Sequence, residues 1–207
     1  MATDADDRDR AHYFTDDPDT ASDPVDVDVV LPDVAFTLRT DRGVFSRGHV
    51  DTGSSVLLRA GLSLPPNGHV LDLGCGAGPI ALAMAKRAPG AIVWAVDVNG
   101  RARALTQVNA DRNGVRNIRV AAPDEVPGDI RFAAIWSNPP IRIGKPALRE
   151  LLVAWLDRLT PDGSAALVVQ RHLGADSLQR WLVAEGYETT RRSSKAGFRL
   201  LSVAARH

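Results

Sequence analysis

The sequence has few of the residues that mark disulfide-stabilised, metal-binding or membrane proteins. Cys75 is the single cysteine among 207 residues, so no disulfide can form within the chain. The five histidines form no HxxxH or HxE pair and there is no CxxC motif, which argues against zinc chemistry. No apolar run approaches the ~20 residues that a membrane-spanning helix needs. We therefore expect a soluble protein that binds neither a membrane nor a metal ion.

The N-terminal segment also lacks a targeting signal. It opens MATDADDRDR, which has neither the apolar stretch of a secretory signal nor the arginine-rich character of a transit peptide. We therefore expect a cytoplasmic protein. The first 33 residues contain eleven aspartates and two arginines, which leaves residues 34–207 with about nine positive charges in excess. We predict an acidic flexible tail at residues 1–11 and a basic body, whose charge suits either phosphate backbones or plain solubility.

Residues 12–61 are predicted to form a β-hairpin and a helix that pack on a core domain at residues 62–207. Short β-rich runs with breaks at Pro32, Asp41 and Gly43 predict the hairpin. An apolar stripe within residues 51–61 predicts the helix, and the Pro-Pro-Asn-Gly sequence at 65–68 predicts a turn.

The core domain alternates apolar runs with helical patterns, which is typical of a doubly wound α/β fold. The runs lie at 69–74, 91–97, 117–122, 132–138 and 164–170, and the helical patterns at 79–88, 100–113, 146–159 and 174–185. Two closing strands, 187–193 and 198–205, are joined by a linker too short for a parallel crossover, so they predict an antiparallel edge hairpin. We expect a mostly parallel, seven-stranded Rossmann-like sheet with its ligand at the carboxyl ends of the strands.

A glycine-rich loop follows the first strand of this sheet. The sequence Asp72-Leu-Gly-Cys-Gly-Ala-Gly78 allows a tight turn and a close approach of a ligand to the next helix. The following strand ends in Asp97, a carboxylate suited to both hydroxyls of a ribose. The spacing GxGxG differs from the nicotinamide fingerprint GxGxxG, and no P-loop Lys-Ser/Thr is present. The pair therefore favours an adenosyl cofactor over a dinucleotide.

These residues resemble the first two motifs of the class I S-adenosylmethionine-dependent methyltransferases. The first motif is similar to VLDLGCGAGPIAL at residues 70–82, and the second ends in Asp97. The resemblance implies S-adenosylmethionine as cofactor, with Asp97 on the ribose, Val98 on the adenine and Asp124 near the adenine amino group. It places the methionine part of the cofactor near Asp72, Gly74, Cys75 and Gly76.

The fourth strand ends in a rigid polar turn, Asn138-Pro139-Pro140. Because proline fixes φ and lacks an N–H, the neighbouring carbonyls are free to accept hydrogen bonds. The Asn138 side-chain oxygen and the Pro139 carbonyl could accept two N–H bonds from one amine and aim its lone pair at a methyl donor. The alternative is a strand-ending turn with no chemical role.

This turn is similar to the (N/D)PP(Y/F/W) signature of methyltransferases that act on planar amines, although Ile141 takes the place of the aromatic. Three longer strings, GVFSRGHVDTGS, SNPPIRIGK and VVQRHLGADSLQRWL, resemble the ribosomal RNA small-subunit guanine-N2 methyltransferases, most closely their short single-domain bacterial relatives. The resemblance implies that Phe45 and Ser46 border the cofactor, with Asp51 and Gly53 in a loop that closes on it. The N-terminal hairpin is then either a lid or only a support for the sheet.

Basic residues after the turn predict contacts with substrate. Ile141 would offer an apolar face to a base, while Arg142 and Lys145 would meet phosphates beside an extruded nucleotide, or be only exposed loop charges. Arg191, Arg192 and Lys195 of the closing hairpin would add charge to the same rim. The four tryptophans fall on strands or apolar helix faces and are expected in the core.

Together these patterns predict an S-adenosylmethionine-dependent N-methyltransferase that acts on guanine N2 of ribosomal RNA, free or in the small ribosomal subunit. Asn138, Pro139 and Pro140 are the expected catalytic residues. The alternatives are a methyltransferase for a protein glutamine or a small-molecule amine, a nicotinamide-dependent oxidoreductase, and a non-catalytic RNA-binding or assembly protein.

Overall fold

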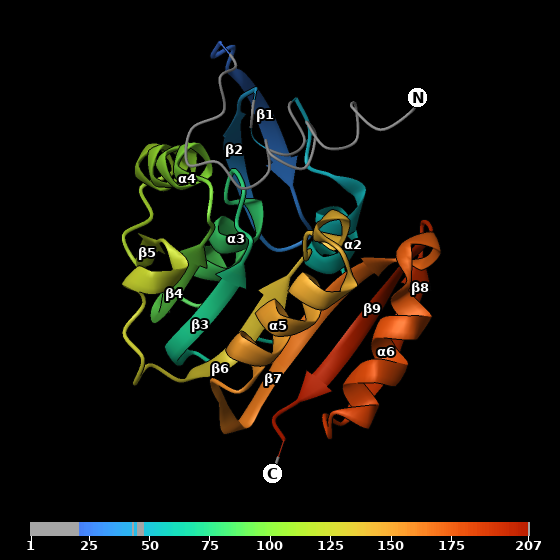
Figure 1. The fold of residues 1–207 in the computed structure, drawn as a ribbon. Coiled ribbons are helices and arrows are strands. Elements are labelled where there is room, and N and C mark those ends of the chain that lie inside the picture. Colours follow the sequence, from blue (N-terminus) through green and yellow to red (C-terminus); the bar gives the residue numbers. More distant parts are fainter. Residues whose placement is uncertain (1–20, 43, 45–47, 207) are drawn as a thin grey trace.

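The structure is a computed structural model that describes residues 21–42, 44 and 48–206 (Figure 1). A two-stranded antiparallel hairpin, β1 (Val25–Val30) and β2 (Ala35–Thr40), precedes a seven-stranded sheet. The sheet strands are β3 (Asn67–Leu73), β4 (Gly90–Val96), β5 (Ile118–Ala121), β6 (Phe132–Ser137), β7 (Leu159–Gln170), β8 (Thr189–Lys195) and β9 (Phe198–Ala204). Their order is β5-β4-β3-β6-β7-β9-β8, with antiparallel pairing only at β7–β9 and β9–β8. The predicted fold is confirmed, including both hairpins.

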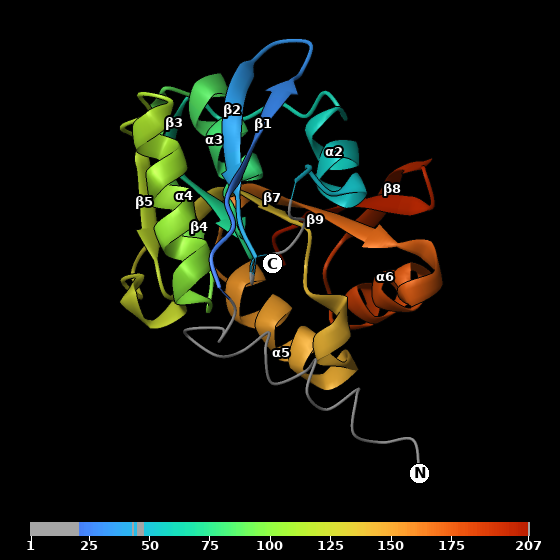
Figure 2. The same ribbon diagram turned by 90° about the horizontal axis from the view of Figure 1, so that it is seen from above.

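Within the described residues, five helices cover the two faces of the sheet. They are α2 (Thr52–Leu58), α3 (Pro79–Arg87), α4 (Gly100–Arg112), α5 (Lys145–Leu156) and α6 (Ala175–Ala184). Figure 2 shows α2 and α3 on one side and α5 and α6 on the other. Two separate apolar cores result, because successive strand residues point to opposite faces: Val70 of β3 packs in the first core and Leu71 in the second. Trp94, Trp136 and Trp155 are buried in these cores and Trp181 is partly buried, as the sequence predicts.

The order of the strands reverses between β3 and β6, which brings two loops of the sequence together. β3 pairs with β6 in parallel, with Leu73 opposite Ser137. The Ser137 hydroxyl donates a 2.7 Å hydrogen bond to the Leu73 carbonyl and fixes the two strand ends. The glycine loop follows one end and the Asn-Pro-Pro turn follows the other, at the place where open α/β sheets bind ligands.

The N-terminal hairpin is attached to α4 by two buried or half-buried asparagine side chains. The Asn109 amide accepts from the Arg39 N–H (2.7 Å) and donates to the Arg39 carbonyl (2.8 Å). Asn113 does the same with Thr37, at 3.2 and 2.8 Å. Asn109 also donates to the Ala77 carbonyl in the glycine loop (2.8 Å). The two side-chain amides therefore bond to the backbone of β2 as a neighbouring strand would, and Asn109 also joins β2 to the glycine loop.

Some predicted boundaries were wrong. Asn67 and Gly68 belong to β3 rather than to a turn, because they pair with Gly90 and Ala91 of β4. The helix expected to reach residue 159 ends at Leu156, since Leu159 already pairs with Phe132 as the first residue of β7. The predicted acidic tail and most of the β-rich run after residue 42 lie outside the described residues. Within the described chain, no helix is long and apolar enough to cross a membrane.

Candidate active site

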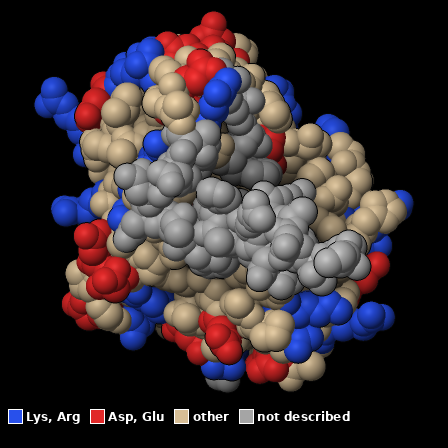
Figure 3. Space-filling model, turned by 45° about the horizontal axis from the view of Figure 1, so that its top comes forward, with Lys and Arg blue, Asp and Glu red and all other residues tan. Residues whose placement is uncertain are grey.

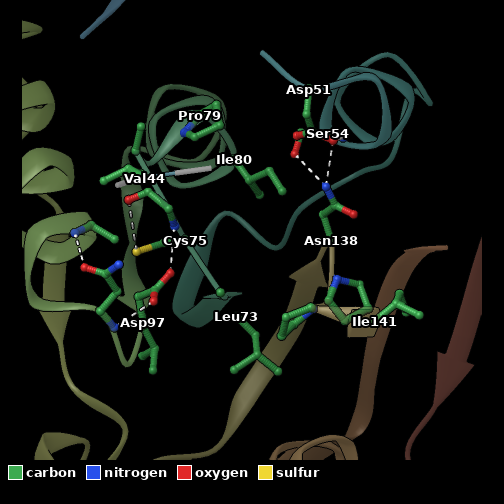
Figure 4. A pocket seen from close by; sticks show the side chains of 18 of the residues that line it. Val44, Asp51, Ser54, Leu73, Cys75, Pro79, Ile80, Asp97, Asn138 and Ile141 are labelled. Carbon is green, nitrogen blue, oxygen red and sulfur yellow. Dashed lines mark hydrogen bonds between the residues drawn. The ribbon is translucent and has the colours of Figure 1, made fainter. Parts of the chain in front are cut away.

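A cavity of about 570 Å³ opens at the carboxyl ends of β3, β4 and β6 (Figure 4), and residues of the N-terminal hairpin border it. Its volume lies within the ~300–1,000 Å³ typical of small-molecule sites. One end contains the glycine loop and Asp97, and the other contains the Asn-Pro-Pro turn and Phe198. The hairpin contributes Leu38 and Thr40, so it covers the cavity as well as packing on α4.

The glycine loop is bonded to the end of β4. Gly74 and Cys75 donate their N–H groups to the Val96 carbonyl at 2.8 and 3.1 Å, and Gly76 donates to the Asp97 carboxylate at 2.9 Å. Gly74 and Gly76 have φ of 78° and 56°, which L side chains rarely adopt, and both line the cavity. The loop thus exposes backbone where a side chain would block a ligand.

The Asp97 carboxylate lines the cavity between this loop and α4. Its second oxygen accepts a 2.9 Å bond from the Asn99 N–H, and burial raises the pKa of the carboxyl. Val98 lines the cavity beside it, and so does Pro123 of the neighbouring loop. A carboxylate next to apolar lining fits the ribose and adenine of an adenosyl cofactor, and the open glycine backbone fits its amino-acid part.

The Asp72 carboxylate is buried away from the cavity. One oxygen accepts a 2.9 Å bond from the Ala81 N–H in the first turn of α3, and the other has no partner among the described residues. Burial raises the pKa of Asp72 to about 8. Its predicted contact with the methionine part of the cofactor stays a prediction.

The variant Asp72→Asn should abolish the contribution of Asp72 to the pH dependence of the free energy of unfolding. The folded protein keeps a proton on Asp72 up to about pH 8, whereas the unfolded chain releases it near pH 4. The free energy of unfolding therefore falls as pH rises between these values, by up to about 1.4 kcal/mol per pH unit from this group. Urea unfolding at pH 5, 6.5 and 8 measures the slope, with the exposed Asp162→Asn as control. Equal slopes in wild type and Asp72→Asn would contradict the assignment.

The Asn138 side chain at the other end of the cavity has a fixed orientation. Its Nδ2 donates to Asp51 Oδ1 at 2.8 Å and to Ser54 Oγ at 3.3 Å. Figure 4 shows the amide nitrogen directed at these two residues and the amide oxygen turned away from them. The amide oxygen is left as the hydrogen-bond acceptor, since no described residue donates to it.

Asp51 and Gly53 bring the start of α2 against Asn138. The same Asp51 oxygen caps α2 by accepting from the N–H groups of Gly53 (2.8 Å) and Ser54 (3.1 Å). A Cβ on Gly53 would lie 3.0 Å from Asn138 Oδ1 and 3.0 Å from Phe198 Cε1. A side chain at residue 53 would therefore push against both Asn138 and Phe198, and glycine avoids this.

The structure brings only some of the other predicted site residues to the cavity. Pro139, Pro140 and Ile141 line it, and Cys75 lines it with a thiol whose pKa burial raises well above its usual range. Asp124 does not line the cavity; its neighbour Pro123 does. Lys145 is exposed at the start of α5 and is not part of the lining either. Phe45, Ser46 and the Arg142 side chain lie outside what the structure describes.

Sequence reasoning missed several lining residues that come from distant elements. Ser54 follows the cap of α2, and an N-cap pattern around Asp51 could have indicated it. Phe198, at the start of β9, and Glu150, on α5, gave no local signal. In the described part of the chain, no group of three or more His, Cys, Asp or Glu could hold a metal ion.

Three features together define a class I methyltransferase. They are the doubly wound sheet, the glycine loop bonded to the carboxylate that follows the next strand, and the Asn-Pro-Pro turn beside this loop. The chain belongs to the methyltransferase small domain family, whose model matches residues 35–202. The predicted enzyme class and the predicted cofactor, S-adenosylmethionine, are thereby confirmed.

Individual relatives differ in how much of their length they share with this chain. The uncharacterized protein YbxB of Bacillus subtilis is 34% identical over 169 residues, which are 80% of this chain and 84% of YbxB. Ribosomal RNA small subunit methyltransferase C of Ectopseudomonas mendocina is 37% identical over 64% of this chain and 44% of its own length. The solved T. thermophilus 16S rRNA N2 methyltransferase RsmC, in complex with AdoMet and guanosine, superimposes with a TM-score of 0.76 at 26% identity. That match covers 91% of this chain and 52% of RsmC, so the chain spans about half the length of these rRNA methyltransferases.

Proposed function

We propose that the protein transfers a methyl group from S-adenosylmethionine to the N2 amine of a guanine in ribosomal RNA, in the cytoplasm. The observation that carries this proposal is the fixed amide of Asn138, whose oxygen is left to accept a hydrogen bond next to the cofactor cavity. The substrate class rests on the T. thermophilus RsmC and the E. mendocina relative, both named as rRNA methyltransferases.

Bound S-adenosylmethionine supplies an electrophilic methyl group. The amine of guanine is a poor nucleophile, because its lone pair is delocalised into the ring. Asn138 Oδ1 and the Pro139 carbonyl would accept hydrogen bonds from its two N–H groups. These bonds would localise the lone pair on the nitrogen and point it at the methyl carbon. As the new N–C bond forms and the bond between the methyl carbon and the sulfonium sulfur breaks, positive charge develops on the nitrogen and both acceptors would bind its N–H groups more strongly. The nitrogen then loses one proton to water, so the mechanism needs no strong base.

Phe198 provides the aromatic face that Ile141 lacks. Its ring lies in the cavity near Asn138, within 3.0 Å of the position of a Cβ on Gly53. Loss of base stacking costs about 1–3 kcal/mol. We expect Phe198→Leu to raise the KM for RNA by about tenfold or more and to leave the KM for S-adenosylmethionine unchanged. Steady-state kinetics measure both, and Phe198→Tyr, which keeps the ring, should behave like wild type. An unchanged RNA KM in Phe198→Leu would exclude stacking.

The test of the proposal is incubation with methyl-labelled S-adenosylmethionine and separate pools of ribosomal subunits, free RNA and protein from cells lacking the gene. Nucleoside analysis of the labelled pool should identify N2-methylguanosine, and the Asn138→Ala variant should produce none. Label in glutamine of a protein would overturn the proposed substrate. A different methylated nucleoside would support RNA as the substrate and contradict guanine N2 as the methylated group.

A further inference from the structure

A second, smaller cavity lies between the end of α2 and the β8–β9 hairpin. Its volume is about 260 Å³, below the range of sites that enclose a whole small molecule. Three cationic side chains line it, Arg59, Arg192 and Lys195, and none of the other described residues in its lining is acidic. Its remaining lining residues are small or apolar, with Ser193 as the one hydroxyl. Such a cavity fits one anionic group of a larger ligand.

The three cations are available for such a ligand. All three residues are exposed, and none forms an ion pair with a described residue. Arg59 donates to the Val30 carbonyl at 2.9 Å, which holds its guanidinium in place without neutralising it. The neighbouring Arg191, by contrast, is paired with Asp176 on α6 at 3.2 Å.

An irregularity in β8 separates these two kinds of arginine. The register of β8 against β9 shifts between Arg191 and Ser193. Arg191 contacts α6 on one face of the sheet, whereas Arg192 and Ser193 both line the cavity next to α2 on the other. The extra residue of the bulge thereby adds a cation to the cavity.

The second cavity and the candidate active site share two structural elements. Ser54 near the start of α2 contacts Asn138, and Arg59 follows the end of the same helix, about 7.5 Å further along the helix axis at 1.5 Å per residue. In the closing hairpin, Phe198 lines the active site and its pairing partner Lys195 lines the second cavity. A nucleic-acid strand a few nucleotides long can therefore reach both.

We propose that this basic cavity binds a backbone phosphate of the RNA strand whose target base enters the active site. The proposal rests on the proposed function for its choice of RNA. The distribution of charge alone does not identify an RNA-binding surface, because Figure 3 shows Lys and Arg all around the visible face, mixed with Asp and Glu. The second cavity differs in that three cations, none of which forms an ion pair with a described residue, converge on one hollow. Phosphate contacts of this kind set the register of the strand and carry no base information.

The test removes the three charges and measures RNA binding rather than methylation. The variant is Arg59→Gln/Arg192→Gln/Lys195→Gln, and the probe is a fluorescein-labelled 12-nucleotide single-stranded RNA containing one guanine. Titration at several salt concentrations gives the slope of log Kd against log salt. Each lost phosphate contact lowers that slope by about 0.7 for a single strand, so we expect a decrease of about 0.7 to 2 and an affinity loss of about tenfold or more at low salt. S-adenosylmethionine affinity should stay at the wild-type value.

The matched control is Arg116→Gln/Arg131→Gln/Arg180→Gln, which removes three exposed charges that line neither cavity. An equal loss of affinity in both triple variants would assign the effect to net charge and overturn the proposal. A salt slope that the first triple variant leaves unchanged would also overturn it. So would a wild-type protein that binds an acidic peptide and no RNA. Wild-type RNA binding that depends on the three residues, together with methylation of another molecule, would refute the proposed function and leave the phosphate site standing.

Discussion

Asn138→Ala is expected to slow methyl transfer by about 10²- to 10³-fold and to change S-adenosylmethionine affinity by less than about threefold. The first number is the usual effect of deleting one preorganised hydrogen-bonding group from an active site. The protein should still fold, because Asp51 keeps its bonds to the N–H groups of Gly53 and Ser54 when the amide is gone. Single-turnover transfer of labelled methyl and calorimetric cofactor titration give the two quantities.

The outcome also separates the proposed chemistry from its rivals. A non-catalytic RNA-binding protein would bind cofactor or RNA without turnover, and the substitution would change nothing. A wild-type rate in Asn138→Ala, with normal substrate binding, would show that the amide oxygen does not orient the amine. The Pro139 carbonyl is unaffected by the substitution, and under the proposed mechanism it would account for the residual activity that we expect.

Asp51→Ala should lower the rate of transfer by about ten- to a hundredfold, although Asp51 need not touch the substrate. Without the Asp51 carboxylate, Asn138 keeps only the longer bond to Ser54 and its amide can rotate. Loss of the helix cap also costs about 1 kcal/mol of stability. Asp51→Asn retains an acceptor oxygen at this position, and we expect it to recover most of the rate. Rates at saturating substrate, together with thermal unfolding, distinguish orientation from instability.

A double-mutant cycle sharpens this test. If Asp51 acts through Asn138, then Asp51→Ala/Asn138→Ala should be no slower than Asn138→Ala alone. Additive losses would instead indicate that Asp51 has a separate role, such as supporting the hairpin over the cofactor. Equal rates in Asp51→Asn and Asp51→Ala would also contradict the orienting role.

The sequence was sufficient for the fold because each strand and helix carries its own pattern. The apolar run at 132–138 indicates a buried strand, and the motifs around Gly74 and Asn138 are contiguous in sequence. The contact between Asp51 and Asn138 spans 87 positions and cannot be inferred from spacing. The same is true of Phe198, whose place beside Asn138 follows from the antiparallel return of β9 along β7.

The sequence also could not show which of the predicted site residues point into the cavity. The carboxylates of Asp72 and Asp97 are both expected near a cofactor from their motifs, yet Asp97 lines the cavity and Asp72 is buried beneath α3. The difference arises because Asp72 lies within β3 and bonds to α3 on one face of the sheet, whereas Asp97 follows the last residue of β4. Pro123 rather than Asp124 reaches the cavity for the same kind of reason, since the short helix at Pro123–Glu125 turns their side chains apart.

The side-chain amide of Asn109 links the N-terminal hairpin to the glycine loop that lines the cofactor cavity. One side chain bonds both backbone groups of Arg39 and the Ala77 carbonyl of the glycine loop. We expect a ligand that stabilises the loop to make opening of the hairpin rarer, in which case a destabilised hairpin weakens ligand binding by the same factor. Slow hydrogen exchange at the amides of Thr37 and Arg39, more than 30 positions before the loop, would then report an occupied cofactor site.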